Sequence, residues 1–122
     1  MSDIQFDTNI LVDALHEHPQ AWAELRRARR CWISRISWTE LLAGAPENAV
    51  AQTERFLDLF AVAEVDEEVS RRAAALYQQR PTMGLPAATI LASAQLGGRI
   101  LVTRNSKDFP ANMPGIRIPY TL

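Results

Sequence analysis

The stretch GLPAATILASAQLGGRILVTRNSKDF, residues 84–109, decides the predicted fold because it joins a helix, a strand and a polar turn. Pro86 suits the first turn of a helix, where its missing N–H costs nothing, and Gly97 with Gly98 is typical of a helix end. The small residues of this helix allow close approach to its neighbours, so we expect it to be buried and central. The apolar run that follows, residues 99–103, is typical of a short strand.

The same alternation of helices and strands runs along the rest of the chain. Apolar runs predict short strands, and apolar residues at helical spacing predict helices between them. The predicted strands are DIQFD (3–7), CWIS (31–34), FAVAEV (60–65), RILVT (99–103) and IRI (116–118), and the predicted helices cover 19–30, 36–43, 50–60, 65–79 and 86–97. Such alternation in one short domain indicates an α/β fold in which helices cover both faces of a parallel sheet.

Length and composition predict one soluble domain over residues 1–122, with 48% hydrophobic and 22% charged residues. No apolar run approaches the roughly 20 residues of a membrane-spanning helix, and the first ten residues lack the pattern of a signal peptide. The single cysteine, Cys31, excludes an internal disulfide and a cysteine zinc cluster. We therefore expect a cytoplasmic protein without a membrane contact. The net charge of −1 argues against a protein that coats nucleic acid by bulk electrostatics.

Polar side chains follow the predicted strands at the edge where the carboxyl ends of parallel strands meet. Asp7 and Asn9 come just after the first strand, Glu40 lies in the helix after the second, and Asn105 and Asp108 follow a later strand. Chemistry in such sheets gathers at this edge. Carboxylates that converge without a lysine need a cation, and these oxygen donors suit Mg²⁺ or Mn²⁺. Taken one at a time, each acid is better explained without a metal, as a helix cap for an Asp just after a strand and as an exposed helix residue for Glu40.

The helix predicted over 86–97 lacks an acid where one is expected. Unpaired N–H groups and the helix dipole leave the first turn partly positive, which favours Asp or Glu. Here the first turn offers Ala87 and Ala88, and no acid occurs between Glu68 and Asp108. Good helix propensity explains an alanine at this position but not a long stretch without acids.

Three segments together resemble, in order and spacing, the PIN-domain ribonucleases, and within them the VapC-type toxins of type II toxin–antitoxin pairs. They are FDTNILVDAL (6–15), ISWTELLAGA (36–45) and GLPAATILASAQLGGRILVTRNSKDF (84–109). The resemblance covers essentially the whole chain. It implies a three-layer α/β/α sandwich with a central parallel sheet, and an endoribonuclease that depends on Mg²⁺ or Mn²⁺.

The resemblance also implies a role for each acidic motif position. Asp7 matches the first metal-binding acid of the family and Glu40 the second. The third acid of the family usually follows LP at the start of the small-residue helix, where this chain has Ala87. The fourth position maps to Asn105 or Asp108, and both remain candidates as metal ligands.

Supporting residues and partners follow from the same resemblance. Thr8, Asn9 and Thr103 are expected to orient the ligands and water, and Arg104 is expected to contact the RNA backbone. The implied partners are an RNA substrate, a second copy of the chain in a homodimer, and a cognate antitoxin whose carboxyl-terminal segment covers the active-site groove.

Two explanations compete for Ala87. It is an introduced substitution that disables a toxic nuclease, or the chain is a naturally inactive PIN domain that binds RNA or an antitoxin. We favour the first because the other motif positions still match. A phosphoaspartate enzyme is a third class with an Asp after its first strand, but such sites need a second acid nearby, and Thr8 and Asn9 follow Asp7 here.

Overall fold

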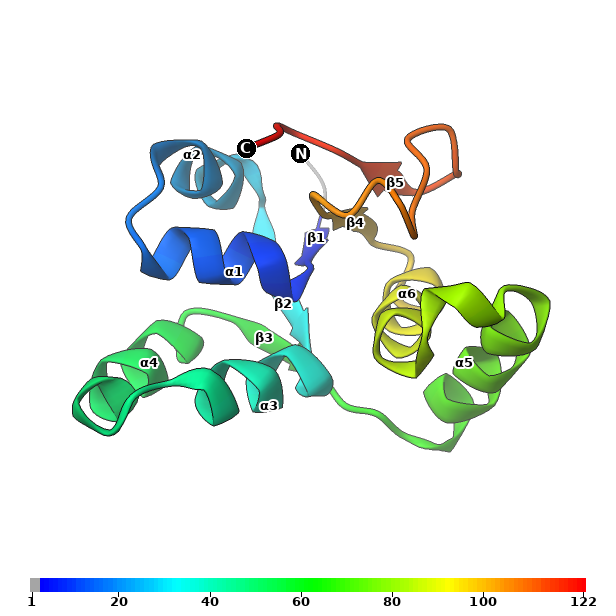
Figure 1. Cartoon of the computed structure of the whole chain (residues 1–122), viewed down its shortest axis with the longest axis horizontal. Helices are drawn as coiled ribbons and strands as arrows, with labels where there is room; N and C mark the ends of the chain where they lie inside the picture. Colours follow the sequence, from blue (N-terminus) through cyan, green and yellow to red (C-terminus); the bar gives the residue numbers. More distant parts are fainter. Residues whose placement is uncertain (1–2) are drawn as a thin grey trace.

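A sheet of five parallel strands in the order β3-β2-β1-β4-β5 forms the centre of the molecule (Figure 1). The computed structural model describes residues 3–122. The strands are β1 (Asp3–Phe6), β2 (Arg30–Ser34), β3 (Ala61–Ala63), β4 (Ile100–Val102) and β5 (Ile116–Arg117). In the central strand, Ile4 pairs with Cys31 of β2 on one side and with Ile100 of β4 on the other. The parallel sheet predicted from the sequence is confirmed.

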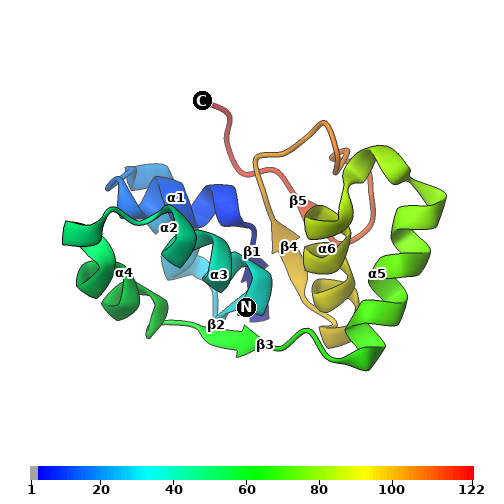
Figure 2. The ribbon, with the colours of Figure 1, turned by 60° about the horizontal axis from the view of Figure 1, so that its bottom comes forward.

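Helices cover both faces of this sheet, so the predicted α/β/α architecture is also confirmed. They are α1 (Thr8–Leu15), α2 (Pro19–Arg27), α3 (Arg35–Gly44), α4 (Val50–Leu57), α5 (Glu67–Gln79) and α6 (Leu85–Gly97), with short 3₁₀ turns at Glu47–Ala49 and Pro81–Met83. Figure 2 shows α1 to α4 on one side of the strands and α5 with α6 on the other. Within residues 3–122, no helix is both long and apolar enough to cross a membrane.

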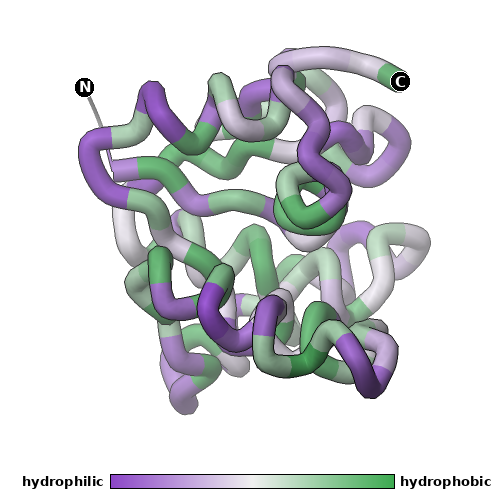
Figure 3. Tube along the Cα trace, turned by 90° about the vertical axis from the view of Figure 1, so that its left-hand side faces the viewer, coloured by the Kyte–Doolittle hydropathy of each residue, from purple (hydrophilic) through white to green (hydrophobic). Residues whose placement is uncertain are grey.

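The hydrophobic core has two parts, one on each face of the sheet. Phe6 and Val102 pack with residues of α1, α2 and α4, whereas Leu101 packs with α5 and α6. Neighbouring residues of a strand point to opposite faces, which is why Leu101 and Val102 belong to different parts. Hydrophilic and hydrophobic residues alternate along the helical segments in Figure 3, as burial of one helix face requires.

Helix α1 is the element that the sequence analysis did not predict. Ile10, Leu11 and Val12 form a continuous apolar run, which hides the helical period of the segment. Only Ile10 and Leu11 of this run are buried, while Val12 is exposed. Asp7 is the N-cap of the helix, and its side chain accepts a hydrogen bond from the backbone N–H of Thr8. The first acid of the site therefore also begins the first helix.

Helix α6 is buried between the sheet and α5, as its small residues predict. Residues 90–94 of this helix are all buried, and the side chain of Gln5 in β1 donates to the backbone oxygen of Ile90 at 2.8 Å. The helix ends at Gly98, whose φ of 66° is a left-handed conformation that favours glycine. This packing places the first turn of α6 beside the carboxyl ends of β1 and β4.

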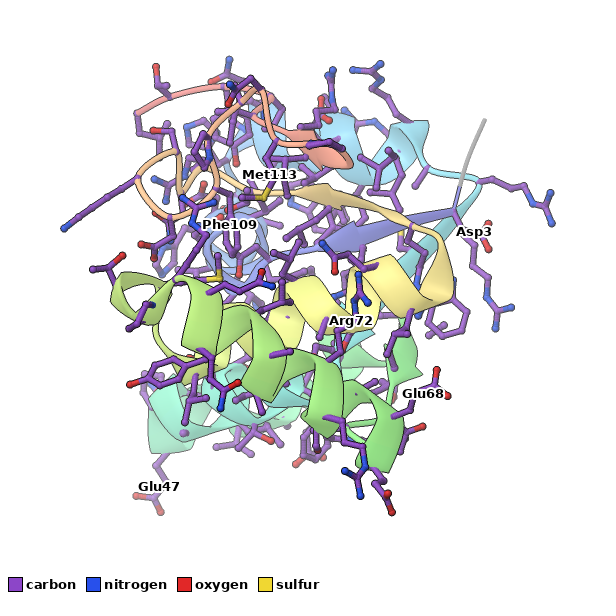
Figure 4. The ribbon with its side chains drawn as sticks, turned by 90° about the vertical axis from the view of Figure 1, so that its right-hand side faces the viewer. Asp3, Glu47, Glu68, Arg72, Phe109 and Met113 are labelled. Atoms are coloured by element: carbon purple, nitrogen blue, oxygen red, sulfur yellow. The ribbon has the colours of Figure 1, made fainter. Side chains whose placement is uncertain are left out.

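The loop between β4 and β5 is held to the second core. Phe109 is fully buried in that core, and Met113 packs against it. Figure 4 shows both side chains in this loop, with α5 in front of α6 and Arg72 at their contact; Arg72 donates to Gln95 of α6 at 2.7 Å. Anchoring Phe109 restrains the preceding segment, which contains Asn105.

Candidate metal centre

A pocket lies where four segments meet at the carboxyl ends of the central strands. Its lining residues come from the start of α1, from α3, from the Pro81–Met83 turn with α6, and from the loop after β4: they are Asp7, Thr8, Asn9, Glu40, Met83, Pro86, Ala87, Ile90 and Asn105. The predicted meeting of these distant segments is therefore present in the fold. Among the described residues that line the pocket, none carries a basic side chain.

Asp7 is the most buried acid of this pocket, with 6% of its surface exposed. Its backbone N–H donates to the oxygen of Val102, so the ends of β1 and β4 are joined beside it. One carboxylate oxygen, Oδ1, accepts from the N–H of Thr8 at 2.7 Å, and the other, Oδ2, accepts from the hydroxyl of Thr103 at 2.7 Å. These bonds fix the orientation of the carboxylate.

The pKa of Asp7 lies above its usual value, chiefly because burial disfavours the charged form. The negative charges of Glu40 and Asp108 raise it further, while the hydrogen bonds from Thr103 and Thr8 oppose the rise. The fold therefore buries a carboxylate, gives it two neighbouring negative charges, and lines its pocket without a cation. Such an arrangement favours a cation from solution.

Glu40, on the exposed face of α3, accepts a hydrogen bond from the hydroxyl of Thr8, which in turn contacts the hydroxyl of Ser37. Thr8 Oγ1 donates to Glu40 Oε1 at 2.7 Å and lies 2.9 Å from the hydroxyl oxygen of Ser37. A hydroxyl has one proton to donate, so Ser37 is the donor of the second bond when Thr8 donates to Glu40. The sequence analysis missed Ser37; its spacing of three residues before Glu40 on one helix face was the available signal.

Asn9 and Thr103 join the start of α1 to the segment that follows β4. The amide nitrogen of Asn9 donates to the hydroxyl oxygen of Thr103 at 3.3 Å, and its amide oxygen accepts from the N–H of Arg104 at 3.1 Å. The hydroxyl of Thr103, which is fully buried, also accepts from the N–H of Asn105 at 3.0 Å. Thr103 thus contacts both Asp7 and the residue that follows Arg104.

Asn105 and Asp108, the two candidates for the fourth position, bind each other. The side chain of Asn105 donates to Asp108 Oδ2 at 2.8 Å and accepts from the N–H of Asp108 at 3.2 Å. Asn105 lines the pocket and Asp108 does not. Over the part of the chain that the structure describes, no group of three His, Cys, Asp or Glu residues is placed to hold a metal ion. Asp7, Glu40 and Asp108 therefore do not form a closed cluster of three acids, and their ligand roles stay predictions.

Ala87 occupies the first turn of α6 and lines the pocket with Asp7 and Glu40. The first turn of a helix presents unpaired N–H groups, and this one contains no acid. A carboxylate at this position would enter the pocket and would also be favoured by the helix dipole. Ala87 therefore lies at the pocket, and its replacement of a metal ligand stays a prediction.

Arg104, the predicted RNA contact, binds an acid outside the pocket. Its guanidinium donates to both carboxylate oxygens of Asp13, with Nε 2.6 Å from Oδ2 and Nη2 3.0 Å from Oδ1. Asp13 is 6% exposed and also accepts from the hydroxyl of Tyr120 at 2.7 Å. The sequence analysis missed Asp13 and Tyr120, and the RNA contact of Arg104 stays a prediction.

Comparison with known proteins agrees with the fold. A family model of the PIN domain matches residues 4–112, so the chain belongs to the PIN-domain family. A toxin–antitoxin complex from Klebsiella pneumoniae contains a chain with 37% identity and a TM-score of 0.88, and the match covers 98% of this chain and 99% of that one. The predicted family is confirmed.

Further structural relatives come from other bacteria. A DNA-bound VapBC from Salmonella typhimurium matches with 25% identity and a TM-score of 0.77, over 97% of each chain. FitAcB from Neisseria gonorrhoeae matches with 23% identity and a TM-score of 0.77, over 98% of this chain and 99% of that chain, and shares the fold. A search of curated protein sequences found no match.

Proposed function

We propose that this chain is a metal-dependent endoribonuclease toxin of the VapC type whose activity is reduced by Ala87. The observation that carries the proposal is Asp7, a buried carboxylate with a raised pKa, next to Glu40 in a pocket without a basic side chain. Perturbed acids of this kind are typical of functional sites. Membership of the PIN-domain family, with toxin–antitoxin complexes among the structural relatives, supports a nuclease toxin at the level of the family.

The donor set fits one Mg²⁺ or Mn²⁺ ion. Asp7 and Glu40 bring carboxylates to the pocket and Asn105 brings an amide group, whose oxygen also accepts from the N–H of Asp108. Hard divalent ions prefer such oxygens, and Mg²⁺ is commonly held by one or two carboxylates together with substrate phosphates. We propose Asp7 and Glu40 as direct ligands, with Asn105 or Asp108 completing the site. When bound, the ion supplies charge stabilisation at a phosphodiester and lowers the pKa of water.

The residues of the chain prepare this site before a ligand arrives. Thr103 and the N–H of Thr8 orient the carboxylate of Asp7, and the hydroxyl of Thr8 with Ser37 behind it orients Glu40. Preorganised ligands bind metal more tightly because less conformational freedom is lost on binding. Both carboxylates are therefore already oriented by hydrogen bonds before a cation binds.

Ala87 removes one candidate oxygen ligand from the same pocket. With two carboxylates in place of three, the site is expected to bind its ion weakly and to cleave RNA slowly. The lining position of Ala87 beside Asp7 and Glu40 supports this interpretation.

A binding module is the second candidate function. In that case the chain is an inactive PIN domain that retains contacts with RNA or an antitoxin. The observation that favours it is that, across residues 3–122, three potential acid, histidine or cysteine ligands do not come together.

A ribonuclease assay separates the two functions. We would compare the parent chain, Ala87→Asp, and Ala87→Asp combined with Asp7→Asn, each in Mn²⁺ and in Mg²⁺. The nuclease predicts that Ala87→Asp cleaves at least about 100-fold faster than the parent, and that adding Asp7→Asn abolishes the gain. Thr82→Asp is the matched control, because it adds the same charge just before α6 but outside the pocket. A folded Ala87→Asp protein that binds RNA without cleaving it establishes the binding module.

The proposed partners are an antitoxin and a second copy of the chain. The structural relatives from Klebsiella pneumoniae and Salmonella typhimurium are toxin–antitoxin complexes, which supports an antitoxin partner. Light scattering of the purified chain tests the homodimer. Co-expression with the product of an adjacent small gene, followed by purification through a tag on one chain, tests the antitoxin.

A further inference from the structure

Arg104 is held at two points by the same face of α1. Its backbone N–H donates to Asn9 Oδ1 at 3.1 Å, and its guanidinium donates to both oxygens of Asp13. Asn9 and Asp13 are four residues apart on the helix, so their side chains lie one above the other. The helix therefore binds both the backbone and the side chain of one residue in the loop after β4.

Asp13, the acid that binds the guanidinium, is buried, and both of its carboxylate oxygens accept hydrogen bonds. Asp13 is 6% exposed, and its Oδ2 atom accepts from Tyr120 at 2.7 Å in addition to Arg104. The ring of Tyr120 is buried and stacks on His18, with 5.4 Å between ring centroids. A charged residue in such surroundings is costly to leave unpaired.

The residues on either side of Arg104 are the ones that reach the site. Thr103 donates to Asp7 at 2.7 Å, and Asn105 lines the pocket. Arg104 is not among the lining residues, and its side chain is 27% exposed. The Nε and Nη2 groups of Arg104 form the edge of a guanidinium that suits a bidentate bond to a phosphate. Both groups donate instead to the carboxylate of Asp13, which suits the same bidentate geometry.

We propose that Arg104 is a positioning residue of the metal centre: through Asp13 and Tyr120 it holds Thr103 and Asn105 in place, and it does not contact RNA. This inference rests on the proposed function in that RNA is the substrate and Asp7 a metal ligand. It replaces the expectation that Arg104 contacts the RNA backbone, and it gives Tyr120, which binds Asp13 from 107 residues away, a part in the geometry of the site.

RNA binding as a function of salt concentration separates positioning from contact. Arg104→Gln, Asp13→Asn and the double variant are compared in the parent chain. An arginine that neutralises a phosphate contributes about 0.7 to the salt slope for single-stranded RNA. Positioning predicts an unchanged slope in Arg104→Gln, a similar effect of Asp13→Asn, and no further effect in the double variant. A slope reduced by about 0.7 in Arg104→Gln, with binding retained or improved in Asp13→Asn, overturns the proposal.

Cleavage kinetics give the second readout, in the Ala87→Asp background. Arg104→Gln and Asp13→Asn are each expected to displace Thr103 and Asn105 and so to misalign the site. Each single variant should therefore lower kcat about tenfold or more and leave KM nearly unchanged. Arg117→Gln is the matched control: the Arg117 side chain makes a comparable bidentate pair with buried Glu24, at 2.9 and 3.1 Å, and does not line the pocket. Its backbone oxygen accepts from the N–H of Thr103, a bond that the substitution keeps. An equal loss of kcat in Arg117→Gln, or a rise in KM alone in Arg104→Gln, overturns positioning.

Amide hydrogen exchange keeps the inference testable if the chain proves not to act on RNA. The N–H groups of Arg104 and Asn105 are bonded to Asn9 and Thr103. Their exchange is expected to accelerate in Arg104→Gln and in Asp13→Asn but not in Arg117→Gln. Tyr120→Phe, a milder change, is expected to accelerate the same two amides. Unchanged exchange in all of these variants overturns the proposal independently of any nuclease assay.

Discussion

Asp7 and Asp13 each expose 6% of their surface, but Asp7 is more deeply enclosed by protein, and their pKa values are shifted in opposite directions. Burial raises the pKa of both carboxyl groups. For Asp13 the hydrogen bonds from Arg104 and Tyr120 outweigh burial and hold the pKa below its usual value. For Asp7 burial dominates and the charges of Glu40 and Asp108 add to it.

The difference between the two acids lies in their partners as well as in their depth. The fold supplies Asp13 with a cation and a hydroxyl donor, so its charge is compensated within the chain. Asp7 receives hydrogen bonds but no cation, and it faces a pocket open to solvent. A buried acid that a chain leaves without a countercharge is a better indicator of ligand chemistry than burial alone.

The largest expected effect comes from removing the countercharge of Asp13. Arg104→Met leaves a buried carboxylate without a cation, and we expect a loss of about 3 kcal/mol in the free energy of unfolding, measured with urea at pH 7. Combining Arg104→Met with Asp13→Leu removes both charges and is expected to recover part of this loss. A cost below about 1 kcal/mol for Arg104→Met contradicts the view that Asp13 depends on its arginine.

The converse experiment supplies a cation, Mn²⁺, to the pocket of Asp7, where the previous one removes the cation beside Asp13. In thermal unfolding, Mn²⁺ at a hundredfold excess over its Kd is expected to stabilise Ala87→Asp by about 2.7 kcal/mol. Without metal, Ala87→Asp is expected to be less stable than the parent, because a third carboxylate joins Asp7 and Glu40. The parent is expected to respond less to the same Mn²⁺ concentration, and Asp7→Asn not at all. A response of Asp7→Asn equal to that of the parent places the ion elsewhere.

Tyr120→Phe tests the uncharged part of the Asp13 environment. The variant removes one hydrogen bond to a buried carboxylate and leaves the ring packing intact, so we expect a loss of about 1.5 kcal/mol in unfolding free energy. Tyr77→Phe is the control, since Tyr77 is 38% exposed on α5. Similar losses in both variants would show that the hydroxyl of Tyr120 contributes no more to the unfolding free energy than an exposed tyrosine hydroxyl does.

The pH dependence of stability is expected to have opposite signs for the two acids, measured in EDTA between pH 3 and 7. The lowered pKa of Asp13 stabilises the folded chain at pH values above the ordinary pKa of 3.8, and this stability is lost as the pH falls through the folded pKa. The loss of unfolding free energy in Asp13→Asn is therefore expected to become smaller on acidification. The raised pKa of Asp7 contributes stability that is lost as pH rises from about 3.8 through the folded pKa. The stability of Asp7→Asn relative to the parent is therefore expected to rise toward neutral pH. Parallel pH profiles for both variants contradict the comparison.

The sequence predicted the elements that have a strong period or clear end signals. Pro86, Gly97 and Gly98 mark α6 correctly, and the rule that chemistry gathers at the carboxyl ends of parallel strands places Asp7 and Glu40 in one pocket. Helix α1 was missed because consecutive apolar residues obscure its period. The course of one loop decides whether Asn105 or Asp108, the two candidates for the fourth position, lines the pocket. Periodicity carries no information about the course of a loop.

The Asp13 environment was not predictable for a different reason. Its partners Arg104 and Tyr120 are 91 and 107 residues away along the chain. No short motif links positions so far apart, and each residue alone is typical of an exposed surface. Contacts of this kind follow from the strand order, in which β1 lies beside β4, and strand order was not deduced from the sequence.

The bond between Tyr120 and Asp13 also determines when the site is completed during synthesis. A ribosome releases α1 and the Asp7 segment early, but Asp13 meets Tyr120 only after residue 120 has emerged. Until then, the segment from Thr103 to Asn105 is held without its full set of bonds. Contacts of such long sequence separation form late in folding because the chain entropy of closing the loop is lost first. On the ribosome, the segment from Thr103 to Asn105 therefore gains its full set of bonds only after residue 120 has emerged.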